Sequence, residues 1–241
     1  AARLRDAGCV AAFVAERRLD EFAASLGPRP GRPALVAVGA GLLGRTGAPH
    51  SPGGATHTPG GGVAALDFSR VVPGMGDAFD GGATSVADDA LLPGDRPPGN
   101  PLTQGALLAA AGEAASGLGV GATDRLFAGL PASTALGVAA GLVAPFLVGA
   151  GVVVEQAFGP STFWKRVADE RVAVALLAAG QVEALLGADG DLGGLDLGRL
   201  RSVACELDRV PRALALAWER RFTVPISPVP AGAPLAAGTK R

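Results

Sequence analysis

The stretch LFAGLPASTALGVAAGLVAPFLVGAGVVV, residues 126–154, decides the fold. It carries no charge, and its 29 residues could cross a bilayer as one apolar span. Pro131, Pro145 and five glycines interrupt it, however, and strands of a buried parallel sheet are apolar on both faces. We therefore predict a strand at 126–129, a helix at 135–147 and a strand at 151–154, inside an α/β core.

The large apolar side chains of this helix define its predicted buried arc. They are Val138, Leu142, Val143, Phe146 and Leu147. The remaining positions are mostly alanine and glycine, so we expect these five side chains to be covered. Pro145 falls in the last turn, where we expect a kink.

Strand and helix patterns alternate along the rest of the chain. We predict strands at 9–14, 34–38 and 63–68, a helix from Asp20, and a helix at 102–118 for which Thr103 is the N-cap. The order is typical of α/β proteins. The predicted domains are a partial α/β subdomain with Gly/Pro-rich loops at 1–101, an α/β subdomain of the same fold at 102–228, and a linker or tail at 229–241, with linker-like composition from Pro225 onward.

Composition excludes several classes of function. The formal net charge is −1, so the chain as a whole has no excess positive charge that would attract nucleic acid or an acidic membrane surface. The chain has two cysteines and two histidines, too few for a disulfide scaffold or an evident metal site. The first helix-like run contains charges, so no secretory leader is indicated. We expect a cytoplasmic protein without metal or other cofactors, nucleic-acid partner or membrane association.

A dinucleotide-binding fingerprint is present only in outline. Gly39, Gly41 and Gly44 follow a predicted strand in G-x-G-x-x-G spacing, and Asp67 ends the next strand. The motif needs a helix to begin within it, but residues 39–62 hold nine glycines and three prolines. We interpret this segment, with His50 and His57, as an exposed loop without nucleotide or metal ligands.

Other catalytic patterns are also absent from the sequence. None of the serines lies in a G-x-S-x-G elbow, and both histidines lie in the glycine-rich loop, so no Ser-His-Asp triad is indicated. The spacing of the aromatic residues along the chain is typical of side chains in a hydrophobic core, which favours packing over a cofactor site. They are Phe158, Phe163, Trp164, Trp218 and Phe222.

Residues 102–228 contain an ordered series of short motifs. Residues 102–108, LTQGALL, are similar to the helix start L-T-H-x-N-L-L. Residues 119–131 are similar to G-x-x-x-x-D-R-x-x-x-x-L-P, with Asp124, Arg125 and Pro131 in register, and residues 218–225 to F-x-x-x-F-x-V-P. In this order the motifs resemble the large N-terminal domain of the adenylate-forming enzymes, the superfamily of acyl-CoA synthetases, fatty acyl-AMP ligases and adenylation domains. The resemblance implies the layered α/β architecture of that domain.

The residues that the resemblance would assign to ATP differ from the family pattern. The family's Ser/Thr/Gly-rich phosphate loop ending in Pro-Lys-Gly falls on residues 92–99, LPGDRPPG, with Gly94, Asp95, Arg96 and Gly99 at the degenerate phosphate-loop position. No hydroxyl or lysine is present, and a proline has no amide to offer phosphate. The adenine motif G-G-A falls on 206–208, ELD, and Y-G-x-T-E falls on 229–233, VPAGA.

Two functional hypotheses follow, and the sequence leaves both open. The first is a truncated, catalytically inactive acyl-CoA-synthetase-like domain that serves as an interaction or scaffold module, with a synthetase, a carrier protein or a multidomain biosynthetic enzyme as its unidentified protein partner. The second is a ligase-like protein that still binds an acyl or aryl acid, while another protein supplies ATP chemistry. The resemblance gives the acyl-pocket candidates Ser133, Thr134, Leu136 and Gly180. A homo-oligomer is compatible with either hypothesis.

Overall fold

A computed structural model describes residues 11–15, 19–26, 34–38, 56–57, 65–67, 83–93, 101–155, 157–188, 192–206 and 210–230. The chain forms two compact units, Ala1–Ala83 and Thr84–Arg241. The strand and helix pattern of the first unit agrees with the predicted α/β order. The second unit contains the α/β core on which the candidate site is built.

The first unit contains a four-stranded sheet in the order β1-β2-β4-β3. Its elements are β1 (Ala11–Ala15), α2 (Leu19–Leu26), β2 (Ala34–Val38), β3 (Thr56–His57) and β4 (Ala65–Asp67). β3 pairs antiparallel with β4, so His57 lies in a short strand and the prediction of a continuous loop at 39–62 is wrong there. Gly39, Gly41, Gly44 and His50 lie outside the described residues.

The second unit opens with an antiparallel hairpin of β5 (Asp89–Leu91) and β6 (Leu102–Thr103), followed by α4 (Gln104–Leu118). The Thr103 side chain accepts a hydrogen bond from the Ala106 amide at 3.2 Å, which confirms the predicted N-cap. Gly119 ends the helix in the left-handed conformation, with φ of 62°.

A five-stranded parallel sheet in the order β11-β10-β9-β7-β8 follows. Its strands are β7 (Arg125–Ala128), β8 (Gly151–Val153), β9 (Val174–Leu177), β10 (Ser202–Cys205) and β11 (Ile226–Pro228). The prediction that linker begins at Pro225 is wrong for β11, which pairs with β10. Its three residues include a proline, which is why the composition resembled a linker.

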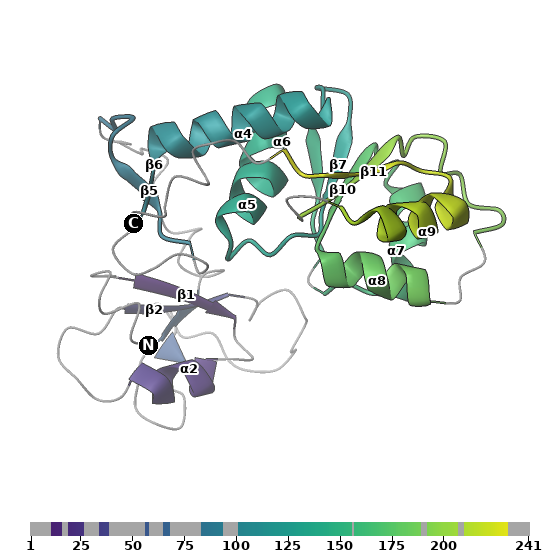
Figure 1. Ribbon diagram of the computed structural model, residues 1–241. Helices are drawn as coiled ribbons and strands as arrows, with labels where there is room; N and C mark the ends of the chain where they lie inside the picture. The colour runs from purple at the N-terminus through teal and green to yellow at the C-terminus, as the bar shows by residue number, and fades with distance from the viewer. Residues whose placement is uncertain are drawn as a thin grey trace. The chain divides into compact units, whose positions relative to one another are not determined.

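Helices cover both faces of this sheet, as Figure 1 shows: α4, α5 (Ala135–Val138) and α6 (Ala144–Val148) lie on one face, and α7 (Pro160–Asp169), α8 (Ala179–Gly187) and α9 (Arg212–Phe222) on the other. Each face of the sheet has its own hydrophobic core, and the side chains of a strand alternate between them. Leu126 packs in the first core, on the side of α4, α5 and α6, and Phe127 packs in the second, on the side of α7, α8 and α9. The second core contains the aromatic residues Phe163, Trp164, Trp218 and Phe222, with Phe158 packed against it, which confirms their packing role.

The stretch 126–154 forms the predicted strand, helix and strand, and in the part of the chain that the structure describes no helix is long and apolar enough to cross a membrane. Its helix is widened by a π-turn, η3 (Ala139–Val143), in front of Pro145. Pro145 has no amide hydrogen and its ring crowds the carbonyl four residues back, which accounts for an irregularity in the turn before it.

The predicted burial of this helix is wrong for Phe146 and Leu147, whereas Val138 and Val143 are partly buried and pack against the core. Phe146 is 72% and Leu147 is 48% exposed, while Leu142 is only half-buried. The fully covered positions are small residues, including Ala139, Ala140 and Gly141. Small side chains let the helix lie close against the sheet: a Cβ added at Gly141 would already contact the Ala128 Cβ at 3.4 Å.

Candidate functional site

The carboxyl edge of the five-stranded sheet contains a reversal of strand order. From β7 the chain moves outward to β8, and it then crosses back to β9 and continues to β10 and β11. In open α/β sheets, ligands bind beyond the carboxyl ends of the strands at such a switch point.

A cavity of about 310 Å³ lies at this position. It is lined by the segments that follow β7 and β8, by the helix between them, and by the first turn of α8. The lining residues are Phe127, Ala128, Gly129, Leu130, Pro131, Ala132, Gly137, Leu142, Val154, Glu155, Ala157, Phe158 and Gln181. The volume and the mostly apolar lining suit a small ligand with an apolar body.

Two glycines shape the walls of the cavity. The Gly129 amide donates to the Leu176 carbonyl at 2.9 Å, and a Cβ at Gly129 would overlap that oxygen. A Cβ at Gly137 would overlap the Pro131 carbonyl oxygen. Both backbone segments therefore approach their neighbours more closely than any residue with a side chain allows.

Gln181 joins α8 to the end of β7. Its Oε1 accepts from the Ala178 amide at 2.9 Å, and its Nε2 donates to the Gly129 carbonyl at 3.0 Å. Both ends of the amide are engaged, so Gln181 positions the cavity wall. Sequence reasoning did not identify this residue, because one polar side chain in a helical first turn is not distinctive.

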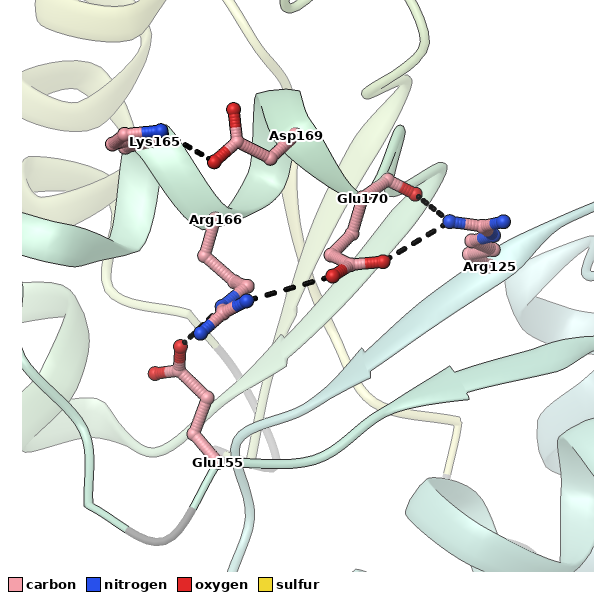
Figure 2. A network of polar contacts seen from close by, with 6 residues as sticks. All are labelled: Arg125, Glu155, Lys165, Arg166, Asp169 and Glu170. Atoms are coloured by element: carbon pink, nitrogen blue, oxygen red, sulfur yellow. Dashed lines mark hydrogen bonds and ion pairs between the residues drawn. The ribbon is translucent and has the colours of Figure 1, made fainter.

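Glu155 is the only charged residue among the described residues that line the cavity. Its Oε1 accepts from Arg166 Nε at 2.9 Å, and its Oε2 is buried without a hydrogen bond in the described part of the chain. Figure 2 shows the rest of this network: Arg166 also forms an ion pair with Glu170 at 3.5 Å, and Glu170 forms one with Arg125 at 3.1 Å. The hydrogen bond to Glu155 is the main reason that the pKa of Arg166 is raised.

The predicted acyl-pocket residues lie beside the cavity without lining it. Thr134 caps α5 by accepting from the Gly137 amide at 3.0 Å, and its hydroxyl donates to the Pro131 carbonyl at 2.9 Å. Ser133 and Gly180 are exposed, and Leu136 packs against the core under α4. Three of them, Ser133, Leu136 and Gly180, directly precede or follow a lining residue.

Gly94, Asp95, Arg96 and Gly99 lie outside the described residues. In the sequence they lie between β5 and β6, and α4 follows β6. Farther along the sheet, Glu206 follows β10, and its Oε1 accepts from the Ala179 amide at 3.3 Å. A carboxylate therefore stands at the first position of the segment onto which the resemblance places the family's adenine motif.

No histidine, serine or cysteine lines the cavity among the described residues, and within these residues no group of His, Cys, Asp and Glu side chains could hold a metal ion. The arrangement defines an α/β protein with a small, mainly apolar ligand cavity at the switch point of a parallel sheet.

The sequence profile of the AMP-binding enzyme family matches residues 96–229, more than half of the chain. The chain therefore belongs to the AMP-binding enzyme family. Among curated proteins, no sequence match was found.

Solved structures of ligases and related enzymes share the fold. An anthranilate–CoA ligase in complex with anthranoyl-AMP has a TM-score of 0.73 at 19% identity, and the similarity covers 92% of this chain and 40% of the ligase. The acyl-CoA synthetase of Brucella canis has a TM-score of 0.71 at 17% identity, covering 93% of this chain and 39% of that enzyme. The luciferase-like enzyme of the nonluminescent mealworm Zophobas morio has a TM-score of 0.69 at 15% identity, covering 92% and 48%. This chain thus spans less than half the length of each.

Proposed function

We propose that this chain is a catalytically inactive ligase-like domain that acts as an interaction module. The observation that supports the proposal is the composition of the connection between β5 and β6. This connection precedes α4, the position at which the resemblance places the phosphate loop. Residues 92–99 contain no serine, threonine or lysine.

Phosphate binding by a loop depends on amide and hydroxyl donors and on a cation. Pro93, Pro97 and Pro98 lack amide hydrogens, and Asp95 would repel a triphosphate. Glu206 adds a second carboxylate at the place where the resemblance puts adenine contacts. By the resemblance, these are two separate segments that contact ATP in the family, and the residues found in both of them disfavour ATP binding.

The proposed partner is a protein: a complete synthetase, a carrier protein or a multidomain biosynthetic enzyme in the cytoplasm. The test is co-expression with the ligases and carrier proteins encoded beside the gene, followed by size-exclusion chromatography with light scattering. We expect one of them to form a complex of defined mass. Absence of any complex, together with saturable binding of Mg-ATP in calorimetry, would contradict the proposal.

The cavity at the switch point supports a second candidate function, the binding of a small acyl or aryl carboxylic acid. A ligand at a hundred times its dissociation constant stabilises a protein by about 2.7 kcal/mol. A thermal-shift series with acyl and aryl carboxylates tests this. Leu142→Trp, which would fill the cavity, should abolish the shift, whereas Leu108→Trp, at an exposed position of α4, should leave it unchanged.

A further inference from the structure

The amino edge of the five-stranded sheet, opposite the cavity just described, carries a cluster of arginines. Arg125 begins β7, Arg171 precedes β9, and Arg199 and Arg201 precede β10. Because these strands are parallel, the segments that precede them meet at one edge. A second cavity, of about 170 Å³, opens there and is lined by Thr123, Asp124, Arg125, Arg171, Ala173 and Arg199.

Two of the arginines are neutralised by carboxylates. Arg201 donates to both carboxylate oxygens of Asp124, at 3.0 and 2.8 Å, and to the Gly119 carbonyl at 2.6 Å. Arg125 donates to Glu170 Oε2 at 3.1 Å, while Glu170 Oε1 faces Arg166 at 3.5 Å. Every oxygen of the two carboxylates is therefore already paired with a cation.

Arg171 and Arg199 have no such carboxylate partner in the described part of the chain. Both are exposed, and neither makes an ion pair or a side-chain hydrogen bond within the described part of the chain. Arg199 is close enough to contribute to the lowered pKa of Asp124, although the Arg201 hydrogen bond is the main cause. The Arg171 backbone is held in a left-handed turn, with φ of 52° and its amide bonded to the Ala168 carbonyl at 3.0 Å. The cavity thus carries two guanidinium groups that form no ion pair with a carboxylate in the described part of the chain.

We propose that this cavity binds a phosphate group, as the free ion or as a phosphomonoester, between the guanidinium groups of Arg171 and Arg199. A guanidinium offers a planar set of donors that matches the oxygens of a phosphate, and two of them balance a dianion. The exposed hydroxyl of Thr123 supplies a further donor at the rim. The site lies at the sheet edge opposite the apolar cavity and does not depend on the proposed function.

Phosphorus-31 NMR titration at constant ionic strength tests the site. Inorganic phosphate and methyl phosphate are titrated against the wild type, the Arg171→Gln/Arg199→Gln variant, and the matched control Arg212→Gln/Arg220→Gln. The control removes two other exposed arginines, on α9, that have no ion pair in the described part of the chain. Circular dichroism of all three proteins verifies that they are folded.

We expect saturable binding to the wild type and the control, and at least about tenfold weaker binding to Arg171→Gln/Arg199→Gln, because charged hydrogen bonds are lost. Tighter binding of methyl phosphate would identify a phosphomonoester as the source, and tighter binding of inorganic phosphate would identify the free ion. Absence of saturable binding to the wild type overturns the proposal. So does unchanged binding by the double variant, or an equal loss in the control, since a general surface charge would explain either.

Discussion

The central sheet of the second unit keeps the residues that its packing requires, whereas the connection between β5 and β6 lacks the residues that phosphate binding requires. In the sheet, Leu126, Phe127, Val174 and Val203 are fully covered and alternate between the two cores. The connection has neither hydroxyl nor lysine. The contrast teaches that a fold and its chemistry depend on different residues, so one can be lost without the other.

The largest loss of stability is expected from truncating a side chain in the aromatic core of the second unit. Trp218 is fully buried and contacts Trp164 and Phe222, with ring centroids 6.0 and 4.5 Å apart. Trp218→Ala should lower the free energy of unfolding by about 3–5 kcal/mol because it leaves a cavity. Urea denaturation measures this.

Trp218→Phe is the matched control for that change. The indole Nε1 of Trp218 is buried without a partner in the described part of the chain, so replacing it removes an unsatisfied donor while keeping most of the ring. We expect a loss below about 1.5 kcal/mol. Equal losses in the two variants would mean that ring packing does not stabilise this core.

A pair of glycine substitutions should have opposite signs and smaller size. Gly137→Ala places a methyl group against the Pro131 carbonyl and should cost about 1–3 kcal/mol. Gly112→Ala, on the exposed side of α4, meets nothing within 4 Å and should stabilise by about 0.4–1 kcal/mol. Thermal denaturation distinguishes the two, and a stabilising Gly137→Ala would contradict the close packing at the cavity.

The Asp124–Arg201 pair should contribute a still smaller, pH-dependent amount. The Arg201 hydrogen bond lowers the pKa of Asp124 below its value in the unfolded chain, about 3.9. The stabilisation is therefore present at neutral pH and is lost as the pH falls through about 4 and below. Because Arg201 is partly exposed, Arg201→Gln should cost less than about 1 kcal/mol at pH 7.

Unfolding curves of wild type and Arg201→Gln between pH 7 and pH 3 test this prediction. The difference between the free energies of unfolding of the two proteins should shrink as the pH falls. Lys165→Gln, which removes an exposed pair with Asp169, is the control. A difference that grows in acid would contradict the assigned cause.

The smallest effect is expected in the connection between β5 and β6. Asp95→Ser and Pro98→Lys change residues for which the sequence predicts no packing role, so each should change the free energy of unfolding by less than about 0.5 kcal/mol. The same denaturation experiment checks them. A loss comparable to that of Trp218→Ala would show that this connection is structural, and it would remove the contrast with the sheet.

Much of the fold was predictable because its elements have strong local patterns. The helix after Thr103, the strand at β7 and the helix that contains Pro145 were all predicted, since capping and apolar runs are local signals. The short strands β3, β5 and β11 were not predicted. They have only two or three residues, too few for any periodic pattern.

The buried face of the 135–148 helix and the position of the cavity required the tertiary structure. Hydrophobicity favoured Phe146 and Leu147 as core residues, but close contact with the sheet selects Ala140 and Gly141 instead. The ligase resemblance led to Ser133 and Gly180, whereas the structure places Gln181 in the cavity wall. Cavities and charge clusters are assembled from loops that lie far apart in the sequence, and local sequence patterns do not indicate which of these loops come together.

ATP–pyrophosphate exchange, measured with a panel of acyl and aryl carboxylic acids, tests whether this chain can form acyl-adenylates. We predict background exchange with every acid, because residues 92–99 offer no hydroxyl or lysine to a triphosphate. Acid-dependent exchange well above background would show that the chain still forms acyl-adenylates, and it would contradict the proposal that its chemistry has been lost.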